Sequence, residues 1–227
     1  MNERKKLVIV GLGETADLAT DYFSNDSKYI ICAYAAEKEY IENKLTEPVL
    51  NGCPVVDIEQ LSEIYPVDDY KVFVAMAYGK LNHDRKAMYE KLKVKGYSFA
   101  SYISSHAFIG SNVSIGENCF ILENNVIQRN VTIGNDVILW SGNHIGHRTT
   151  IADHVFLSSH VAVSGYCYIG ECSFLGINCC VGDNVTIADN CFIGGGVALM
   201  HDTKAGEIYR VPSAKAERLK SSMVFGI

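Results

Sequence analysis

Four histidines lie within 17 residues of one another in this 227-residue chain: His144, His147, His154 and His160. A neutral imidazole accepts a proton near neutral pH, so the cluster is a candidate source of a general base. Imidazole is also a zinc ligand, and His106 with His144 and His147 loosely imitates a three-histidine zinc site. We expect His154 to be structural. We also expect no bound metal, and zinc is kept as an alternative.

A six-residue hydrophobic period surrounds this cluster. Every sixth residue from Ile103 to Leu199 is Ile, Leu or Val, which gives 17 positions without interruption. The next residue is often Gly, and the residue two before is usually small, as at Cys119 and Cys179. Side chains alternate along a strand, so the aliphatic and the small residue point to the same side and both can stack inside a coil. This period is typical of a hexapeptide β-helix.

The first hundred residues alternate strand and helix patterns. They favour a small parallel α/β sheet, with helices that include one opened by the glycine turn GLGETA at residues 11–16. Strands are predicted over residues 5–10, 29–35 and 71–77, and further helices over residues 58–65 and 83–96.

Three regions follow from these patterns. We expect an α/β domain over residues 1–100 and a β-helix domain over residues 101–203. Residues 204–227 have lost the sixfold period and are expected to cap the open end of the coil, as terminal segments of solenoids do.

Composition excludes several classes of protein. The net charge is -6 and the pI is about 5.6, so we expect no nucleic-acid partner. No apolar run of 18 residues occurs, so we expect no insertion into a membrane. The apolar start of the chain ends at Gly11, Gly13 and Glu14, which favours a buried strand over a signal peptide. Eight cysteines without a CxxC pair indicate small core residues in a reducing cytoplasm.

The glycine turn is a candidate phosphate site. Gly11 and Gly13 follow a predicted strand and open a helix, which is the context of a phosphate-cradling turn. A turn that serves only strand-to-helix packing is the alternative. The second strand ends at Tyr34-Ala35-Ala36 without an acidic residue, which argues against NAD.

Four stretches carry a resemblance to a known family: VIVGLGETADLA, VAMAYGKLNHDR, the coil segment IGECSFLGINCCVGDNVTIADNCFIGGGVAL, and VPSAKAERLK. Together they resemble the hexapeptide-repeat nucleotide-sugar N-acetyltransferases of the bacillosamine and perosamine type and the related sialic-acid O-acetyltransferases. The resemblance implies a Rossmann-like N-terminal domain, a left-handed parallel β-helix, and a homotrimer. Three hexapeptides then form one coil, so residues 18 apart stack, and acetyl-CoA lies between neighbouring β-helices.

The resemblance also implies roles for residues near the histidines. His147 stands where the relatives carry their catalytic base, and Gly165 stacks above it, leaving room for a thioester and offering an N–H to the oxyanion. Arg148 follows His147 where an acidic residue is expected, so Asp153 is the candidate that orients the imidazole. His144 is a candidate substrate contact or second base. His160, stacked on Gly142 and Asn178, is a candidate for the same groove.

Two further sets of residues complete the implied site. The coenzyme A groove is expected to include Gly165, Gly176, Ile177, Asn178 and Gly195. The nucleotide-sugar site is expected to include Gly11, Gly13, Glu14, Thr15, Tyr34, Asn82 and Arg85, with Arg85 either meeting phosphate or lying on a solvated helix face.

The predicted function is acetyl-CoA-dependent N-acetylation of a nucleotide-diphospho amino sugar, a 4-amino-4,6-dideoxyhexose. The product would enter bacterial surface-glycan synthesis, such as that of lipopolysaccharide O-antigen. The alternatives are O-acetylation of a sugar of the sialic-acid type, a non-catalytic β-helix that binds a nucleotide-sugar, and a zinc hydratase of the carbonic anhydrase type.

Overall fold

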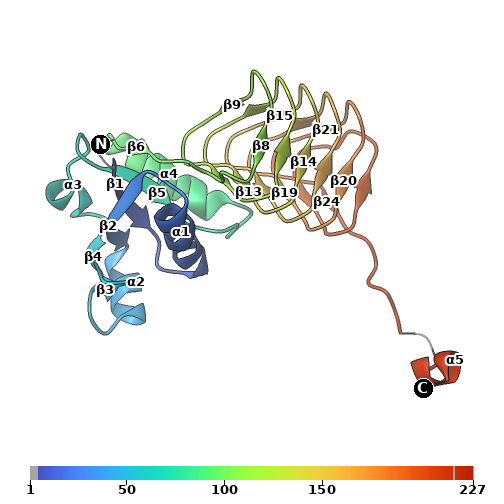
Figure 1. Cartoon of the computed structure of the whole chain (residues 1–227), viewed down its shortest axis with the longest axis horizontal. Coiled ribbons are helices and arrows are strands. Elements are labelled where there is room, and N and C mark those ends of the chain that lie inside the picture. Colours follow the sequence, from blue (N-terminus) through green and yellow to red (C-terminus); the bar gives the residue numbers. More distant parts are fainter. Residues whose placement is uncertain (1–4, 217, 227) are drawn as a thin grey trace.

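The computed structural model describes residues 5–216 and 218–226, and it contains an α/β domain followed by a parallel β-helix (Figure 1). The α/β domain holds one sheet in the order β3-β4-β2-β1-β5-β6. All neighbours in it are parallel except β3 and β4. The strands are β1 (Lys5–Val10), β2 (Tyr29–Ala36), β3 (Val49–Leu50), β4 (Cys53–Asp57), β5 (Lys71–Val74) and β6 (Ser98–Phe99). The helices are α1 (Glu14–Asn25), α2 (Lys38–Lys44), α3 (Leu61–Ile64) and α4 (His83–Val94).

Both faces of the sheet are covered because alternate residues of β1 are apolar on both sides. Leu7 and Ile9 pack in one cluster with Phe23 of α1. Val8 and Val10 pack in another cluster with residues of α3 and α4, such as Leu61 and Leu92. The prediction of a parallel α/β region is therefore confirmed.

Some predicted boundaries are wrong. The helix expected over residues 58–65 is only α3, because Asp57 first forms a turn: its side chain accepts the N–H of Glu59 (3.1 Å) and its carbonyl accepts the N–H of Gln60 (3.0 Å). The strand expected over residues 71–77 ends at Val74. The sequence analysis missed α2, β3, β4 and β6, of which β3 and β6 have two residues each and lie at the two edges of the sheet.

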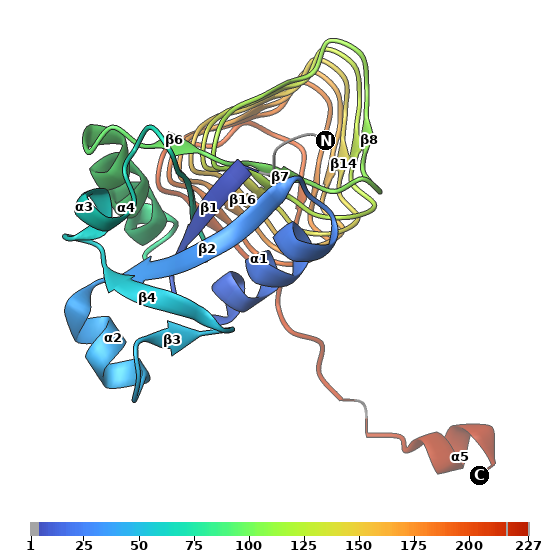
Figure 2. The ribbon, with the colours of Figure 1, turned by 60° about the vertical axis from the view of Figure 1, so that its left-hand side comes forward.

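The β-helix has three parallel sheets around a triangular coil (Figure 2). We name each sheet by the residue type that is common at the outward positions of its strands. The aromatic face holds β7 (Tyr102–Ile103), β10 (Phe120–Ile121), β13 (Ile138–Leu139), β16 (Phe156–Leu157), β19 (Phe174–Leu175), β22 (Phe192–Ile193) and β24 (Ile208–Tyr209). The histidine face holds β8 (Phe108–Ile109), β11 (Val126–Ile127), β14 (His144–Ile145), β17 (Ala162–Val163), β20 (Cys180–Val181) and β23 (Ala198–Leu199). The threonine face holds β9 (Ser114–Ile115), β12 (Thr132–Ile133), β15 (Thr150–Ile151), β18 (Tyr168–Ile169) and β21 (Thr186–Ile187).

The sixfold ladder forms the core of the coil, as predicted. Residues 18 apart pair in register, for example Val126 with His144 and His144 with Ala162. From Ile121 onward the ladder residues are buried in one cluster with the small residues that precede them, including Cys119 and Cys179. Burial raises the pKa of both thiols to about 12, so neither is a reactive thiolate near neutral pH.

The corners of the coil need left-handed backbone. Asparagine occupies seven of these positions with φ between 55° and 60°: Asn112, Asn118, Asn124, Asn130, Asn178, Asn184 and Asn190. Asparagine tolerates this conformation better than other residues with a Cβ, so these seven corners form at low cost.

The outward side chains of the aromatic face position the α/β domain. Phe120, Ile138 and Phe156 are buried in the same cluster as Phe23 of α1 and Phe73 of β5. The other two faces have no domain packed on them among the described residues (Figure 2). Burial of this aromatic column fixes the α/β domain to one side of the β-helix.

The end of α1 is tied to the first coil by Asp26. Its carboxylate accepts the Tyr102 hydroxyl and the Ser105 N–H, each at 2.8 Å. The Ser105 N–H and the Tyr102 hydroxyl hold the pKa of this carboxyl below its usual value. A depressed pKa contributes stability above the unfolded pKa, and that contribution is lost as pH falls through the folded pKa.

Asp26→Asn is therefore expected to lower stability at pH 7 and to flatten the acid side of the stability profile. Urea unfolding at pH 7 and at pH 3 measures this as a smaller difference between the two free energies than in the unsubstituted protein. An equal loss at both pH values would contradict the ionic role of Asp26.

The C-terminal segment corrects one prediction. β24 pairs with β22 and adds a last strand to the aromatic face. Residues 211–216 and 218–226, in contrast, run away from the body to the short helix α5 (Ser221–Phe225), and their side chains are exposed (Figure 1). A cap over residues 204–227 is therefore wrong beyond Arg210, because the described side chains there are exposed.

Candidate functional site

His147 lies at the corner between β14 and β15, where the histidine face meets the threonine face. The side-chain Oε1 of Gln128 accepts the backbone N–H of His147 at 2.9 Å and lies 3.1 Å from its Nδ1. An oxygen that accepts a backbone N–H requires a protonated Nδ1 for the second hydrogen bond. In the neutral imidazole the free lone pair is then on the other ring nitrogen, Nε2, which is the tautomer that presents a general base there.

Gly165 lies directly against the imidazole, as the 18-residue spacing predicts. A Cβ built on Gly165 would lie 2.7 Å from Cε1 of His147 and 3.1 Å from Nε2. The Gly165 N–H, however, donates to Asp183 Oδ1 at 3.0 Å. The expected role of this N–H in holding an oxyanion is therefore wrong in this arrangement, and Gly165 contributes space.

Gly165→Ala is expected to displace the imidazole that is predicted to act as the base, and so to lower kcat by roughly tenfold to a hundredfold, since a small misplacement of a catalytic group is costly. Gly182→Ala is a suitable control, because its Cβ would meet chiefly the flexible sulfur of Met200 at 2.9 Å. Steady-state kinetics of both variants tests this. Equal losses in the two variants would contradict it.

Asp153 does not orient His147. Its carboxylate accepts the backbone N–H of Asn135 at 2.7 Å and the Asn135 side-chain amide at 3.2 Å, at the corner between the threonine and aromatic faces. The sequence analysis missed Gln128 because it lies 19 residues before His147, one residue off the 18-residue stack.

The other histidines lie in different places. His144 is exposed on the histidine face, between Val126 and Ala162. His160 lies at the corner between the aromatic and histidine faces, with its ring against Gly142 as the stacking predicts. One chain does not bring His106, His144 and His147 together, and among the described residues no group of three or more potential metal ligands gathers.

The residues expected at the coenzyme A groove fall into two sets. Gly165 accompanies His147 at one edge of the histidine face. Ile177, half exposed, packs against Gly195 at the other edge, where Gly176 and Asn178 also lie. Both sets border the histidine face, so a groove that includes both must cross that face or form against another molecule.

A cavity of about 490 Å³ opens at the carboxyl ends of β1, β2 and β5. The glycine turn and the start of α1 line it through Gly11, Gly13, Glu14 and Thr15, as predicted. Gly11 has φ 129° and a Cβ there would lie 2.7 Å from the Ala75 carbonyl, so only glycine permits this close approach. The glycine turn therefore lines a cavity in addition to allowing this close packing against Ala75.

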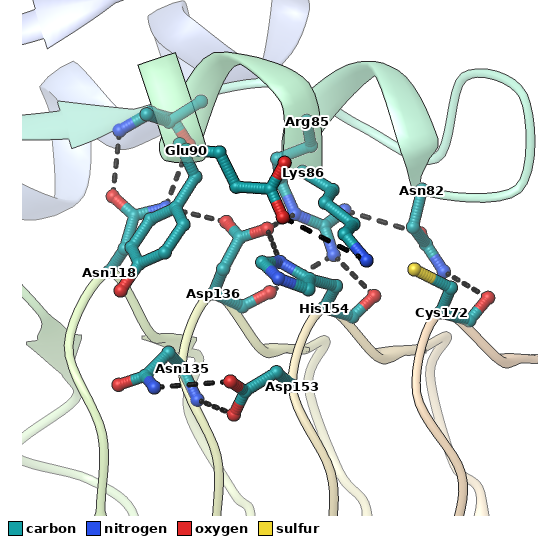
Figure 3. A network of polar contacts seen from close by, with 12 residues as sticks. Asn82, Arg85, Lys86, Glu90, Asn118, Asn135, Asp136, Asp153, His154 and Cys172 are labelled. Atoms are coloured by element: carbon teal, nitrogen blue, oxygen red, sulfur yellow. Dashed lines mark hydrogen bonds and ion pairs between the residues drawn. The ribbon is translucent and has the colours of Figure 1, made fainter. Parts of the chain in front are cut away.

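Three residues predicted for this pocket do not reach it. Tyr34 is buried beneath α1, and its hydroxyl lies 2.6 Å from that of Thr20. Arg85 and Asn82 are fully buried against the coil, where Arg85 Nε donates to Asp136 at 3.0 Å (Figure 3). These three predictions are wrong because the polar groups of these side chains form hydrogen bonds inside the protein.

Arg85 instead joins the two domains. Its remaining N–H groups donate to the carbonyls of Ala77, Asp136 and His154, at 3.0 to 3.1 Å. Asp136 also accepts from His154 and from Asn118, and Asn82 donates to the Cys172 carbonyl (Figure 3). His154 is therefore structural, as predicted, since its Nδ1 lies 2.8 Å from buried Asp136.

The cavity also contains residues that the sequence analysis did not assign. Glu37 and Tyr40 line it just beyond the end of β2, and Asp84 and Met88 line it from α4. The place of Glu37 after the second strand was a usable signal, because strand ends meet at this edge of a parallel sheet.

The comparisons with known proteins agree with this architecture. Residues 166–201 match the family described as "Bacterial transferase hexapeptide (six repeats)". The coil is a hexapeptide-repeat coil. Among curated proteins, none matches the chain.

Two solved structures share the fold over most of the chain. The acetyltransferase domain of PglB from Neisseria gonorrhoeae is 21% identical with a TM-score of 0.78, covering 90% of this chain and 95% of its own; another structure of it contains acetyl coenzyme A. PerB from Caulobacter crescentus, in complex with CoA and GDP-perosamine, is 22% identical with a TM-score of 0.78, covering 89% of this chain and 92% of its own. At these identities the likeness establishes the fold of both parts of the chain.

No helix among the described residues is long and apolar enough to cross a bilayer.

Proposed function

We propose that this protein transfers an acetyl group from acetyl-CoA to the amino group of a nucleotide-linked amino sugar, with His147 as general base. The observation that carries the proposal is the imidazole whose Nδ1 is held by Gln128, beside the space left by Gly165. The similar structures supply the substrate class, since one contains acetyl coenzyme A and another CoA with GDP-perosamine.

The reaction needs one base and no covalent intermediate on the protein. Nε2 of His147 takes a proton from the attacking amine as the nitrogen bonds to the thioester carbonyl carbon. The carbon–sulfur bond then breaks, and the proton passes to the coenzyme A thiolate. Buried Cys119 and Cys179, whose thiol pKa values are raised to about 12, are poor candidates for an acyl carrier.

The nucleotide-sugar fits the cavity of the α/β domain. α1 begins at that cavity, and the N-terminus of a helix favours phosphate. None of the residues that line the cavity comes from the coil. Because the α/β domain covers the aromatic face and His147 lies on the corner opposite that face, the sugar meets His147 only in an assembly of copies.

We therefore place the active site between subunits of a homotrimer. The histidine face supports this arrangement, because its outward column is small or apolar apart from His144: Phe108, Val126, Ala162, Cys180 and Ala198. Such a face suits contact with a second copy. The finer features of the proposal are a left-handed coil, a Rossmann-like first domain, a cytoplasmic location and a role in bacterial surface-glycan synthesis.

A subunit-mixing experiment tests the shared site. Ala77→Trp fills the cavity and leaves His147 intact, whereas His147→Ala leaves the cavity intact. Each variant alone is expected to be nearly inactive with GDP-perosamine and acetyl-CoA. Co-refolded mixtures are expected to regain a substantial fraction of the activity, measured as free thiol release. Mixtures no more active than their parts would contradict a site shared between copies.

O-acetylation of a sugar is the second candidate function. His144, exposed on the histidine face near His147, gives a second imidazole for activation of a hydroxyl, which is a weaker nucleophile than an amine. Mass spectrometry of the product, followed by mild base treatment that removes O-acetyl but not N-acetyl groups, separates the two.

A further inference from the structure

The coil domain contains only two basic lysine or arginine residues, and both flank His147. Across residues 101–203 there are eight carboxylate side chains, no lysine, and the arginines Arg129 and Arg148. Arg129 is one coil before His147 in the 18-residue stack, and Arg148 follows His147 directly. Both side chains are exposed. The positive charge of an otherwise acidic coil is thus concentrated at one corner.

Arg148 occupies a backbone position that asparagine fills in other coils. Its φ is 60°, and Tyr166 in the next coil has φ 57°, while Asn112, Asn130 and Asn184 hold the equivalent corners. A large side chain in left-handed backbone costs free energy compared with asparagine. The two departures from this asparagine column lie in the coil of His147 and in the coil that follows it, which indicates a use for these side chains outside folding.

The side chains at this corner are packed in a defined order. The Arg148 guanidinium carbon lies 5.9 Å from the centroid of the Tyr166 ring, and the His147 ring lies 5.1 Å from the same ring at a steep angle. The Arg148 N–H also donates to the Arg129 carbonyl at 3.2 Å. Among the described carboxylates none forms an ion pair with either arginine, so both guanidinium groups remain available to an anion.

We infer that Arg129 and Arg148 bind an anionic group of the acceptor, a phosphate or a carboxylate, close to the atom that attacks the thioester. This inference rests on the proposed function, and it adds that the acceptor carries a negative charge near the attacking atom. Guanidinium groups recognise both anions by paired hydrogen bonds. The stacking of Arg148 on Tyr166 restrains the guanidinium beside the base.

Distance favours the acceptor over coenzyme A as the source of the anion. The thioester must reach His147, and the extended arm from the thioester sulfur to the coenzyme A diphosphate contains about a dozen bonds, or roughly 15 Å. In a nucleotide-sugar, the phosphate on the anomeric carbon lies about 6 Å from the amine on the opposite ring carbon, as estimated from covalent bond lengths. A carboxylate on the sugar itself would lie at least as close. The corner therefore suits the diphosphate of a nucleotide-sugar or the carboxylate of an acidic sugar.

Binding of two small anions to the full-length protein tests the inference. Inorganic pyrophosphate represents the diphosphate, and pyruvate represents the carboxylate of an acidic sugar. Arg148→Asn removes the charge and restores the residue that other coils carry, so it is expected to fold at least as well. Arg210→Asn is the matched control, since Arg210 also stacks on a ring, Phe192 at 5.4 Å, on the aromatic face.

We expect Arg148→Asn and Arg129→Gln each to weaken the binding of one of these anions at least tenfold, with Arg210→Asn within twofold of the unsubstituted protein. Loss of pyrophosphate binding identifies a diphosphate, and loss of pyruvate binding identifies an acidic sugar. Unchanged affinity for both anions would overturn the inference, as would a loss confined to coenzyme A. A separate assay tests the proposed function itself. If the unsubstituted protein releases no thiol from acetyl-CoA with any nucleotide amino sugar, the proposed function is wrong, whatever the anion-binding result.

Discussion

His147→Ala is expected to lower kcat by about a hundredfold or more while leaving the affinity for both substrates within a few-fold. The His147 ring is fixed by Gln128 at Nδ1 and lies against the space left by Gly165. The side chain is only partly buried and supports no core packing, so the fold should persist. Free thiol release under saturating acetyl-CoA measures kcat, and calorimetric titration with coenzyme A measures binding.

Two matched variants make this result specific. Gln128→Ala removes the acceptor that fixes the imidazole tautomer, so a smaller loss of kcat, about tenfold, is expected. His144→Ala removes an exposed imidazole on the histidine face and is expected to leave kcat within a few-fold. If His144→Ala abolished turnover and His147→Ala did not, the assignment of the base would be wrong.

Arg85→Ala is expected to lower the free energy of unfolding by about 3 to 5 kcal/mol. The substitution removes the partner of the Asp136 carboxylate, which is fully buried, and leaves carbonyls of Ala77 and His154 without their donor. Uncompensated charge in the interior is far more costly than the loss of an exposed pair. Urea unfolding followed by circular dichroism measures the change.

Two comparisons show that the effect comes from the buried charge. Lys38→Ala breaks an exposed pair with Glu42 (3.9 Å) and is expected to change stability by less than about 0.5 kcal/mol. Arg85→Met combined with Asp136→Leu removes both charges and should recover part of the loss. A double variant as unstable as Arg85→Ala alone would indicate that packing, and not charge, dominates at this junction.

Periodicity carried most of the fold prediction. The ladder from Ile103 to Leu199 is a long-range pattern with one physical cause, since each coil must bury one aliphatic residue on each of its three sides. The first domain was predicted less well in detail. β3 and β6 have two residues each, and such short elements carry too little pattern to be recognised. The prediction for the segment beyond Arg210 was wrong because the rule that the end of a solenoid is capped does not specify which residues form the cap.

The site predictions divide along the same line. The stacking rule placed Gly165 against His147 and Gly142 against His160, because both pairs lie in the regular coil. It could not reveal Gln128, which reaches His147 from one position off the stack. Arg85 was misassigned because a charged residue in a helix pattern suggests solvent or ligand. Only the packing of α4 on the coil shows that Asp136 lies opposite it.

The buried junction around Arg85 also bears on function. It fixes α4, which lines the cavity of the α/β domain through Asp84 and Met88, to the coil corners that carry Asp136 and His154. A site that draws its pocket from one copy and its base from another needs both parts held rigidly within each copy. The interior charges are therefore consistent with a positioning role in addition to their effect on stability.

The most direct test of the account is free thiol release from acetyl-CoA with a panel of nucleotide-linked amino sugars, run in parallel on the unsubstituted protein and on His147→Ala. The account predicts turnover of at least one 4-amino-4,6-dideoxyhexose nucleotide by the unsubstituted protein and a loss of about a hundredfold or more in the variant. Equal thiol release by the two proteins, or none with any amino sugar, would contradict it.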